Sequence, residues 1–208
     1  MNKINYQKVL DSQIEKIIAA GEVPSLLLHS CCAPCSSYVI EYLSQYFKIT
    51  VFYYNPNIYP DEEFEKRSDE QKMFIDKFPT KYKVSFIKGN FDKEKFNAAV
   101  KGFEEQPERG ARCTRCYKLR LRESARIAKE LGFDFFTTTL SISPHKDAVR
   151  LNEIGKELSE EYGVKYLYSD FKKKNGFKRS TEISNQYDMY RQDYCGCVYS
   201  YAQSKSRK

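Results

Sequence analysis

Three cysteines stand within five residues of one another directly after an apolar run, and no other feature constrains the chain as strongly. The apolar run covers residues 25–30, and Cys31, Cys32 and Cys35 follow it. A short apolar run that ends in a turn predicts a buried strand, and Pro34 suits the first position of a following helix. In an open α/β sheet the carboxyl end of such a strand borders the ligand crevice. The sequence therefore predicts a thiol-rich site there.

The other four of the seven cysteines form two more short-spaced groups, Cys113 with Cys116 and Cys195 with Cys197. A chain of 208 residues can bury a core without covalent staples. Its N-terminal segment is polar, and no apolar run approaches the roughly 20 residues of a membrane span. We therefore expect a soluble, cytosolic protein with no membrane association. In that setting grouped cysteines indicate metal binding or redox catalysis more than a disulfide scaffold.

Predicted strands and helices alternate along most of the chain. The strands are expected at 25–30, 49–54, 84–88, 134–140 and 164–168. The helices are expected at 5–20, 34–46, 61–78, 92–101, 113–131 and from Pro144 to about Tyr162, with Asp92 and Ser143 as N-caps. This alternation predicts an α/β fold, a mostly parallel Rossmann-like sheet with helices on both faces. The loops 29–35, 55–59 and 141–146 should then line a single crevice.

The C-terminal part differs in composition from the rest. We expect residues 1–169 to form the Rossmann-like domain that carries the cysteine cluster. Residues 170–201 are predicted to be a basic and aromatic arm of the same domain, and residues 202–208 a disordered tail. The segment 171–179 mixes five cations with two aromatic residues and is too polar to be core. The arm should lie across the crevice and carry Cys195 and Cys197 to the other thiols.

The chain carries a net charge of +7, which favours a polyanionic partner but is also common in plain soluble proteins. The predicted helix at 113–131 has a cationic stripe with a spacing of three and four residues. Its members are Arg115, Lys118, Arg122, Arg126 and Lys129. A solvated surface is the default interpretation of such a stripe. Because it begins beside the cysteines and adjoins Arg109 and Arg112, contact with phosphates is favoured here.

The cysteine spacings suit a metal centre. At the start of a helix, Cys113 and Cys116 lie on one face and can be two ligands of one metal or a dithiol pair. Together with Cys31 and Cys32 they offer four thiolates, enough for a [4Fe-4S] cluster or a tetrahedral zinc. Adjacent cysteines are awkward ligands for a tetrahedral mononuclear ion. The pattern therefore favours an iron–sulfur cluster, with zinc and unliganded thiols as the alternatives.

The pair Cys195 and Cys197 is separated by one glycine and is a different kind of group. A disulfide between them would close a small strained ring, and strained bridges are readily reduced. Such a pair suits a two-electron relay. The alternative is that both sulfurs are further ligands of the cluster.

His29 and His145 are the only histidines of the chain. Both fall on the predicted crevice edge, where a general acid would be needed, so both are candidate catalytic residues. The alternative is a hydrogen-bonded structural role. The chain has no glycine-rich dinucleotide or phosphate loop after its first strand, so no nucleotide or flavin site is predicted.

Four longer motifs occur in order along the chain. They are HSCCAPC at 29–35, ERGARCTRCY at 108–117, TTTLSISPHK at 137–146 and YRQDYCGC at 190–197. Together they resemble the motifs of the cobalamin-independent epoxyqueuosine reductases of the QueH type. The resemblance extends from about residue 25 to residue 201 and is far more specific than any single cysteine pair.

The resemblance implies an oxidoreductase that reduces epoxyqueuosine to queuosine at the wobble position of tRNA, the last step of queuosine biosynthesis. It implies a [4Fe-4S] cluster on Cys31, Cys32, Cys113 and Cys116, and a redox-active pair at Cys195 and Cys197. Cys35 is the candidate ligand of an additional mononuclear iron. The substrate would be tRNA, read at its anticodon loop, and an unidentified electron donor would restore the site. The alternatives are an iron–sulfur tRNA sulfur-transfer enzyme and a zinc-stabilised RNA-binding module without chemistry.

Overall fold

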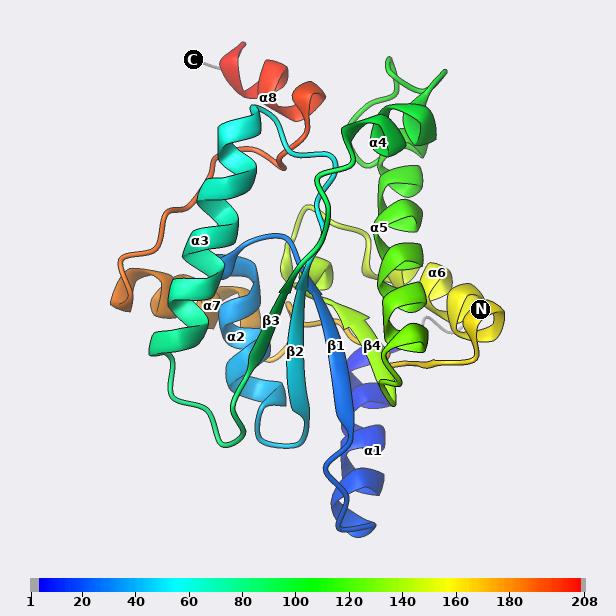
Figure 1. Ribbon diagram of the computed structural model, residues 1–208, viewed down its shortest axis with the longest axis vertical. Helices are drawn as coiled ribbons and strands as arrows, with labels where there is room; N and C mark the ends of the chain where they lie inside the picture. Colours follow the sequence, from blue (N-terminus) through cyan, green and yellow to red (C-terminus); the bar gives the residue numbers. More distant parts are fainter. Residues whose placement is uncertain (1–3, 207–208) are drawn as a thin grey trace.

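A computed structural model describes residues 4–206 of the chain, and its centre is a five-stranded sheet (Figure 1). The strands are β1 (Ser25–Ser30), β2 (Lys48–Tyr53), β3 (Ser85–Lys88), β4 (Phe135–Thr138) and β5 (Lys165–Tyr166). Their order is β3-β2-β1-β4-β5, and each neighbouring pair is parallel. The predicted α/β fold with a Rossmann-like sheet is confirmed.

The apolar run of β1 forms the middle of the sheet because both of its faces are covered. Leu28 pairs with Val51 of β2 on one side and with Thr137 of β4 on the other. Successive side chains of a strand point to opposite faces. Leu26 and Leu28 accordingly belong to one core and Leu27 to the other. Strand β1 is therefore buried on both faces, as the run of three leucines predicts.

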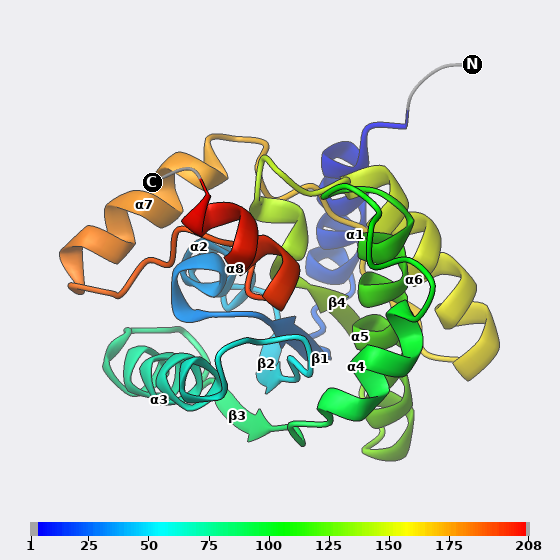
Figure 2. The ribbon, with the colours of Figure 1, turned by 90° about the horizontal axis from the view of Figure 1, so that it is seen from above.

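Helices cover both faces of the sheet (Figures 1 and 2). The core on one face is shared by α1 (Tyr6–Ala19), α2 (Ala33–Leu43), α3 (Asp61–Lys77) and α7 (Gly176–Gln186). The core on the other face is formed by α5 (Ala111–Glu130) and α6 (Ala148–Tyr162), and α4 (Lys93–Val100) packs beside α5. None of the helices within residues 4–206 has the length and apolarity needed to cross a membrane.

The start of α6 differs from the prediction. Strand β4 ends at Thr138, and a short 3-10 helix, η1 (Thr139–Ile142), continues the chain where a longer strand was expected. Helix α6 begins only at Ala148, because the Asp147 side chain caps it by accepting a hydrogen bond from the Arg150 backbone N–H at 3.2 Å. The expected N-cap Ser143 therefore lies in a loop, residues 143–147.

The predicted N-cap of α4 is also only partly correct. Asp92 does stand at the N-cap position of α4. Its side chain makes no capping hydrogen bond and instead accepts one from Lys95 Nζ at 2.7 Å.

The C-terminal segment contributes to the core more than its composition suggests. Phe171 and Ile183 are fully buried against the α1–α2 face of the sheet. The prediction that segment 171–179 is too polar for the core was therefore wrong for Phe171. Three of its five cations form ion pairs within the chain, Lys172 with Asp170, Lys174 with Asp11 and Arg179 with Glu41.

The end of the described chain is helical. Helix α8 (Val198–Lys205) lies above the carboxyl ends of the strands in both views (Figures 1 and 2). A disordered tail was predicted from residue 202, whereas the structure has helix as far as Lys205. Residues 207 and 208 lie outside the described residues.

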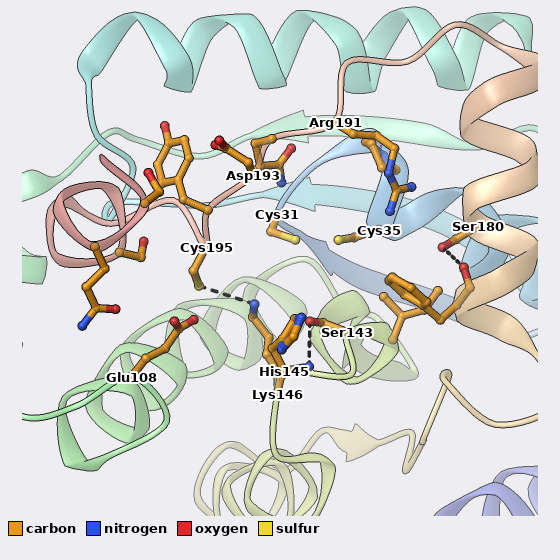
Figure 3. A pocket seen from close by; sticks show the side chains of 18 residues that line it. Cys31, Cys35, Glu108, Ser143, His145, Lys146, Ser180, Arg191, Asp193 and Cys195 are labelled. Carbon is orange, nitrogen blue, oxygen red and sulfur yellow. Dashed lines mark hydrogen bonds between the residues drawn. The ribbon is translucent and has the colours of Figure 1, made fainter. Parts of the chain in front are cut away.

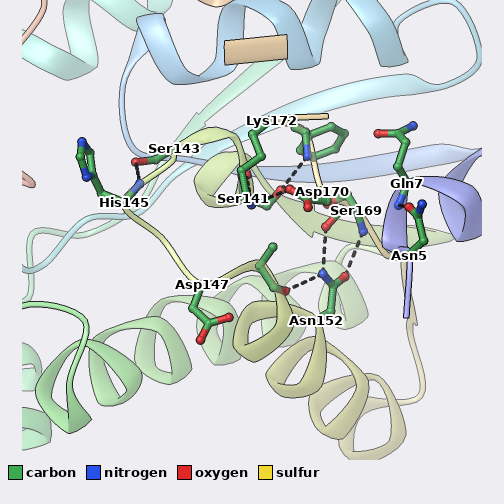
Figure 4. Close-up of polar contacts among 12 residues, drawn as sticks. Asn5, Gln7, Ser141, Ser143, His145, Asp147, Asn152, Ser169, Asp170 and Lys172 are labelled. Atoms are coloured by element: carbon green, nitrogen blue, oxygen red, sulfur yellow. Dashed lines mark hydrogen bonds and ion pairs between the residues drawn. The ribbon is translucent and has the colours of Figure 1, made fainter. Parts of the chain in front are cut away.

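The segment that follows β4 is tied to the segment that follows β5 (Figure 4). Asn152 of α6 donates from Nδ2 to the Ser169 carbonyl at 2.8 Å, and its Oδ1 accepts from the Ser169 backbone N–H at 2.9 Å. The hydroxyls of Ser141 and Ser169 are 3.3 Å apart. These contacts fix η1 and α6, so that the loop 143–147 between them starts and ends on rigid supports.

Gly155 provides a test of the packing between α6 and β5. A Cβ at this position would lie 2.4 Å from ring carbons of Tyr166, so alanine cannot fit unless the helix or the ring moves. We expect Gly155→Ala to lower the free energy of unfolding by about 1–3 kcal/mol, because overpacking a core costs that much. Urea denaturation measures it. Lys156→Ala, at an exposed position on the same helix, is the matched control and should change stability by less than about 0.5 kcal/mol. Equal midpoints for the two variants would contradict the packing argument.

Candidate metal and thiol centre

A cavity of about 460 Å³ opens where the order of the strands reverses, between the loops that follow β1 and β4. The first loop contributes Cys31, Pro34 and Cys35, and the second contributes Ile142, Ser143, His145 and Lys146. Tyr194 and Cys195 of the C-terminal segment and Ser200 of α8 complete the wall (Figure 3). The predicted shared crevice is therefore confirmed for the loops 29–35 and 141–146.

The third predicted crevice loop, 55–59, does not line the large cavity and instead contacts the C-terminal segment. It binds the C-terminal segment: the Tyr59 backbone N–H donates to the Gly196 carbonyl at 2.8 Å, and the Tyr194 hydroxyl donates to the Tyr59 carbonyl at 2.7 Å. Asn55 is buried and donates from Nδ2 to the Ser30 carbonyl at 2.9 Å. This loop thus supports the wall of the site from behind.

Three thiols form a compact group. The sulfurs of Cys31, Cys32 and Cys35 all lie within 4.8 Å of one another, and those of Cys31 and Cys32 are 3.7 Å apart. Cys32 is the N-cap residue of α2 and Cys35 is in its first turn, where the helix dipole favours thiolates. Metal–sulfur bonds of about 2.3 Å in a tetrahedron place the sulfurs about 3.8 Å apart. This triad can therefore hold a metal ion.

Hydrogen bonds among the three thiols shift their pKa values in opposite directions. Contacts with Cys32 and Cys35 hold the pKa of Cys31 well below its usual range. Contacts within the triad raise the pKa of Cys32 to about 12 and that of Cys35 well above its ordinary value. Ionisation is therefore favoured at Cys31, and a metal that binds the triad must displace the protons that remain on its neighbours.

The other four cysteines line a second, much smaller cavity of about 20 Å³. Cys113 and Cys116 come from the first turns of α5, and Cys195 and Cys197 come from the C-terminal segment. Burial raises the pKa of Cys113, and it raises that of Cys116 to about 12. The seven thiols are thus divided into a triad and a quartet, and Cys195 lines both cavities. The predicted set of four cluster ligands takes two residues from each group.

A buried arginine lies between the two groups of thiols. Arg120 is only 2% exposed, and its guanidinium donates to His29 Nε2 at 3.3 Å and to Asn55 Oδ1. Burial alone would lower the pKa of Arg120, but Cys116 and Cys31 outweigh this effect and raise it. A buried charge needs an opposite charge nearby, because desolvation otherwise costs several kcal/mol. The cysteines beside Arg120 therefore fit a bound metal or cluster, which keeps its sulfur ligands as thiolates.

Sequence reasoning missed Arg120, although a signal for it exists. It stands seven residues after Cys113 and four after Cys116, which places all three on one face of α5. An arginine on the cysteine face of a helix is a better candidate for the site than the cations of the outer stripe.

A second buried arginine faces the triad. Arg67 is 1% exposed and is paired with Glu63, with 2.7 Å between Nε and Oε1, while its Nη2 has no hydrogen-bond partner among the described residues. Gln192 of the C-terminal segment donates from Nε2 to the Cys32 sulfur at 3.2 Å. Nitrogen donors and positive charge therefore surround Cys32 as well, and the charge of Arg67 opposes the rise in its pKa that the neighbouring thiols cause.

Three members of the cationic stripe of α5 form ion pairs with glutamates, Lys118 with Glu157 at 2.9 Å, Arg122 with Glu161 at 3.0 Å, and Arg126 with Glu123 at 2.8 Å. Glu157 and Glu161 belong to α6, so two of the five cations connect neighbouring helices. The pairs are exposed, as expected of a solvated surface, and contact of the stripe with phosphates stays a prediction.

The two histidines lie in different environments. His29 is fully buried, with its Nδ1 hydrogen-bonded to the Thr138 hydroxyl at 2.8 Å and its Nε2 3.1 Å from the Tyr54 carbonyl and 3.3 Å from Arg120 Nε. His145 is exposed and lines the large cavity, and its backbone N–H donates to the Ser143 hydroxyl at 3.3 Å. Only His145 is therefore placed where it can reach a molecule in that cavity.

Comparisons with known proteins agree with one another. The sequence model of one protein family, described as epoxyqueuosine reductase QueH, matches residues 26–203. Curated proteins with that same description are similar over most of the chain. One from Staphylococcus epidermidis is 45% identical, covering 95% of this chain and 85% of the relative. One from Streptococcus pyogenes is 45% identical, covering 95% of this chain and 78% of the relative. One from Thermotoga maritima is 33% identical, covering 88% of this chain and 93% of the relative.

The environment of His29 makes a prediction about pH. Burial, followed by the charge of Arg120, lowers the pKa of His29 from 6.5 to about 3. Between these values the unfolded chain binds a proton that the folded chain does not, so stability is lost as the pH falls below 6.5. In a His145→Gln variant, imidazole NMR signals of the folded protein should stay in the neutral form from about pH 5 to pH 8, and those of the urea-unfolded protein should titrate. A folded-state titration in that range would contradict the buried, neutral assignment.

Proposed function

The chain belongs to the epoxyqueuosine reductase QueH family, and from this premise we propose how its thiols serve that reaction. It is an oxidoreductase that converts epoxyqueuosine to queuosine, the last step of queuosine biosynthesis. The family match over residues 26–203 carries this conclusion, because it includes all seven cysteines and every residue that lines the two cavities except Ser204. The rest of the proposal concerns what each group of residues contributes.

Cys31, Cys32, Cys113 and Cys116 hold a [4Fe-4S] cluster in this proposal. Its support is the positive charge that faces each part of the donor set, Arg120 beside Cys116 and Cys31 and Arg67 beside Cys32. Four thiolates on a cluster are a negatively charged unit, which buried guanidinium groups can offset. When bound, such a cluster supplies electrons at a potential set by charge and hydrogen bonds around its sulfurs.

Cys35 is the proposed ligand of an additional mononuclear iron. Two observations support it. Its sulfur lies within 4.8 Å of those of Cys31 and Cys32, and Cys35 lines the large cavity, which Cys32 does not. An ion at Cys35 would therefore be open to a molecule in the cavity while remaining next to the other two thiols.

The reduction needs two electrons and two protons for each epoxide that becomes an alkene and water. Cys195 and Cys197 can supply both, because two thiols that form a disulfide release two electrons and two protons. Cys195 lines the large cavity, where the substrate would bind. The imidazole of His145 and the ammonium of Lys146 lie in the same wall and can hold protons near the departing oxygen. An external donor, whose identity the chain does not reveal, must then reduce the disulfide.

A tRNA substrate fits the charge and the rim of the cavity. The chain has a net charge of +7, and two of the residues that line the cavity are Arg191 and Phe177. Phe177 is 40% exposed, and the Arg191 guanidinium lies 5.9 Å from the centre of its ring. An exposed ring beside a guanidinium is a suitable surface for an unstacked base. We also propose a cytoplasmic location, which a tRNA substrate and a metal centre on free thiols favour.

The activity is tested directly on modified tRNA. Protein reconstituted with iron and sulfide under anaerobic conditions is incubated with tRNA that contains epoxyqueuosine and with a strong reductant. We expect nucleoside mass spectrometry to show conversion of epoxyqueuosine to queuosine, and to show none for protein treated with an iron chelator. A requirement for ATP, or sulfur incorporated into the tRNA, would instead favour the sulfur-transfer alternative. A colourless, inactive protein with one zinc would favour the RNA-binding module.

Replacement of single cysteines separates ligands from the redox pair. Cys113→Ala and Cys116→Ala should each lose iron and the visible absorbance of the cluster. Cys35→Ala should keep the cluster and lose only the additional iron. Cys195→Ser should keep all iron and stop multiple turnover, because the pair can no longer cycle. Iron analysis and absorbance spectra are the measurements. Loss of the cluster from Cys195→Ser would make Cys195 a ligand and would remove it from the proposed pair.

A further inference from the structure

The two members of the Cys195–Cys197 pair stand in different surroundings. Cys195 lines the large cavity, and Lys146 Nζ donates a hydrogen bond to its sulfur at 3.4 Å (Figure 3). Cys197 lines only the small cavity, at the N-cap of α8, and its thiol donates to the Ser200 hydroxyl at 3.5 Å. One sulfur therefore faces a full positive charge, and the other faces a neutral hydroxyl and the weaker partial charge of a helix N-terminus.

The ammonium of Lys146 is delivered from a well-supported loop. The loop 143–147 runs from η1 to the Asp147 cap of α6, and both of those elements are fixed by the contacts of Asn152 and Ser141 (Figure 4). Lys146 is half-buried. Its side chain extends across the cavity wall to the C-terminal segment. Its hydrogen bond to Cys195 connects the β4 side of the site to the Cys195–Cys197 pair.

The turn between the two cysteines has a fixed backbone conformation. Gly196 has a φ of 121°, a conformation that residues with a side chain rarely adopt. A Cβ at this position would also lie 3.1 Å from Arg67 Nη1. The Gly196 carbonyl accepts a hydrogen bond from the Tyr59 backbone N–H at 2.8 Å. The turn is therefore held in place, and the difference in surroundings of the two sulfurs is built into it.

We propose that Lys146 is a positioning residue that makes Cys195 the reactive sulfur of the pair and leaves Cys197 as the resolving sulfur. The thiolate is the nucleophilic form of cysteine, and an adjacent ammonium stabilises it. The Cys195 sulfur lies beside the Lys146 ammonium at the wall of the large cavity, and Cys197 then closes the disulfide from behind. The assignment of roles in catalysis rests on the proposed function, whereas the contact between Lys146 and Cys195 does not.

The atoms and electrons of this assignment balance. Two thiols lose two protons and two electrons when the bond between the sulfurs of Cys195 and Cys197 forms. The epoxide takes up the same two electrons and two protons as its two C–O bonds break, which leaves an alkene and one water. A dithiol or an electron-transfer protein of lower potential must then return two electrons to the disulfide.

The test measures thiol reactivity in the absence of tRNA. Lys146→Met and Lys146→Arg are each combined with Cys197→Ser, which leaves Cys195 without its partner. Alkylation by iodoacetamide at neutral pH under anaerobic conditions is followed by peptide mass spectrometry. We expect Lys146→Met to slow alkylation of Cys195 by about tenfold or more, because less of it is thiolate. Lys146→Arg, which keeps the charge, should retain most of the rate.

Three controls make the result specific. Lys146→Met combined with Cys195→Ser should leave alkylation of Cys197 unchanged. Lys173→Met, which removes an exposed cation from the C-terminal segment, should leave both thiols unchanged. Iron content should be equal in all variants. If Lys146→Met does not fold, Lys146→Gln removes the charge with a polar side chain of similar length.

An unchanged rate for Cys195, or an equal loss at Cys195 and Cys197, would overturn the proposal. The outcome is independent of the proposed function. A protein that fails to reduce epoxyqueuosine but shows Lys146-dependent alkylation of Cys195 alone would refute the reaction and keep the assignment of the lysine. An active enzyme whose Cys195 is alkylated at the same rate with and without Lys146 would support the reaction and refute the assignment of the lysine.

Discussion

Positive charge buried beneath sulfur is the constraint on which the rest of this structure depends. Arg120 and Arg67 lie almost entirely within the protein, one next to Cys116 and Cys31 and the other next to Cys32. A guanidinium cannot be neutralised at physiological pH, so its cost of burial must be offset by an anion. Glu63 provides it for Arg67, and the thiols are the groups that can provide it for Arg120. Their conversion to thiolates, which a metal promotes, is therefore favourable for the fold as well as for the metal.

The sheet explains why thiols so distant in sequence meet. The strand order reverses beside β1, so the loops after β1 and β4 diverge and leave a cavity between them. Helix α5 packs on the face of Leu27, and its first turns line the small cavity together with Cys195 and Cys197 of the C-terminal segment. Each group of cysteines thus occupies the start of a helix or a held turn. Supports of this kind are what a metal centre requires.

Whether a feature of the fold or the site could be predicted depended on how far apart in the sequence the residues that determine it lie. The bounds of β1 were predicted correctly because its apolar run stops abruptly, and the meeting of the loops 29–35 and 141–146 followed from a parallel sheet. The division of the thiols into a triad and a quartet could not be predicted, because it depends on how α5 is placed against β1. The pairing of Lys118 with Glu157 could not be predicted either, since it requires the relative placement of two helices. The late start of α6 was a local error: Asp147 competes with Ser143 as cap.

The C-terminal segment is better understood as part of the site than as a cover over it. Gln192 donates to the Cys32 sulfur on the β1 side, and Cys195 accepts from Lys146 on the β4 side, so the segment spans the point where the strand order reverses. The Tyr190 backbone N–H is in turn held by Glu70 of α3. Because two of these three contacts end on sulfur, the strength with which the segment is held depends on the charge of the thiols. Sulfur chemistry in the cavity and the position of the segment are therefore linked through the same hydrogen bonds.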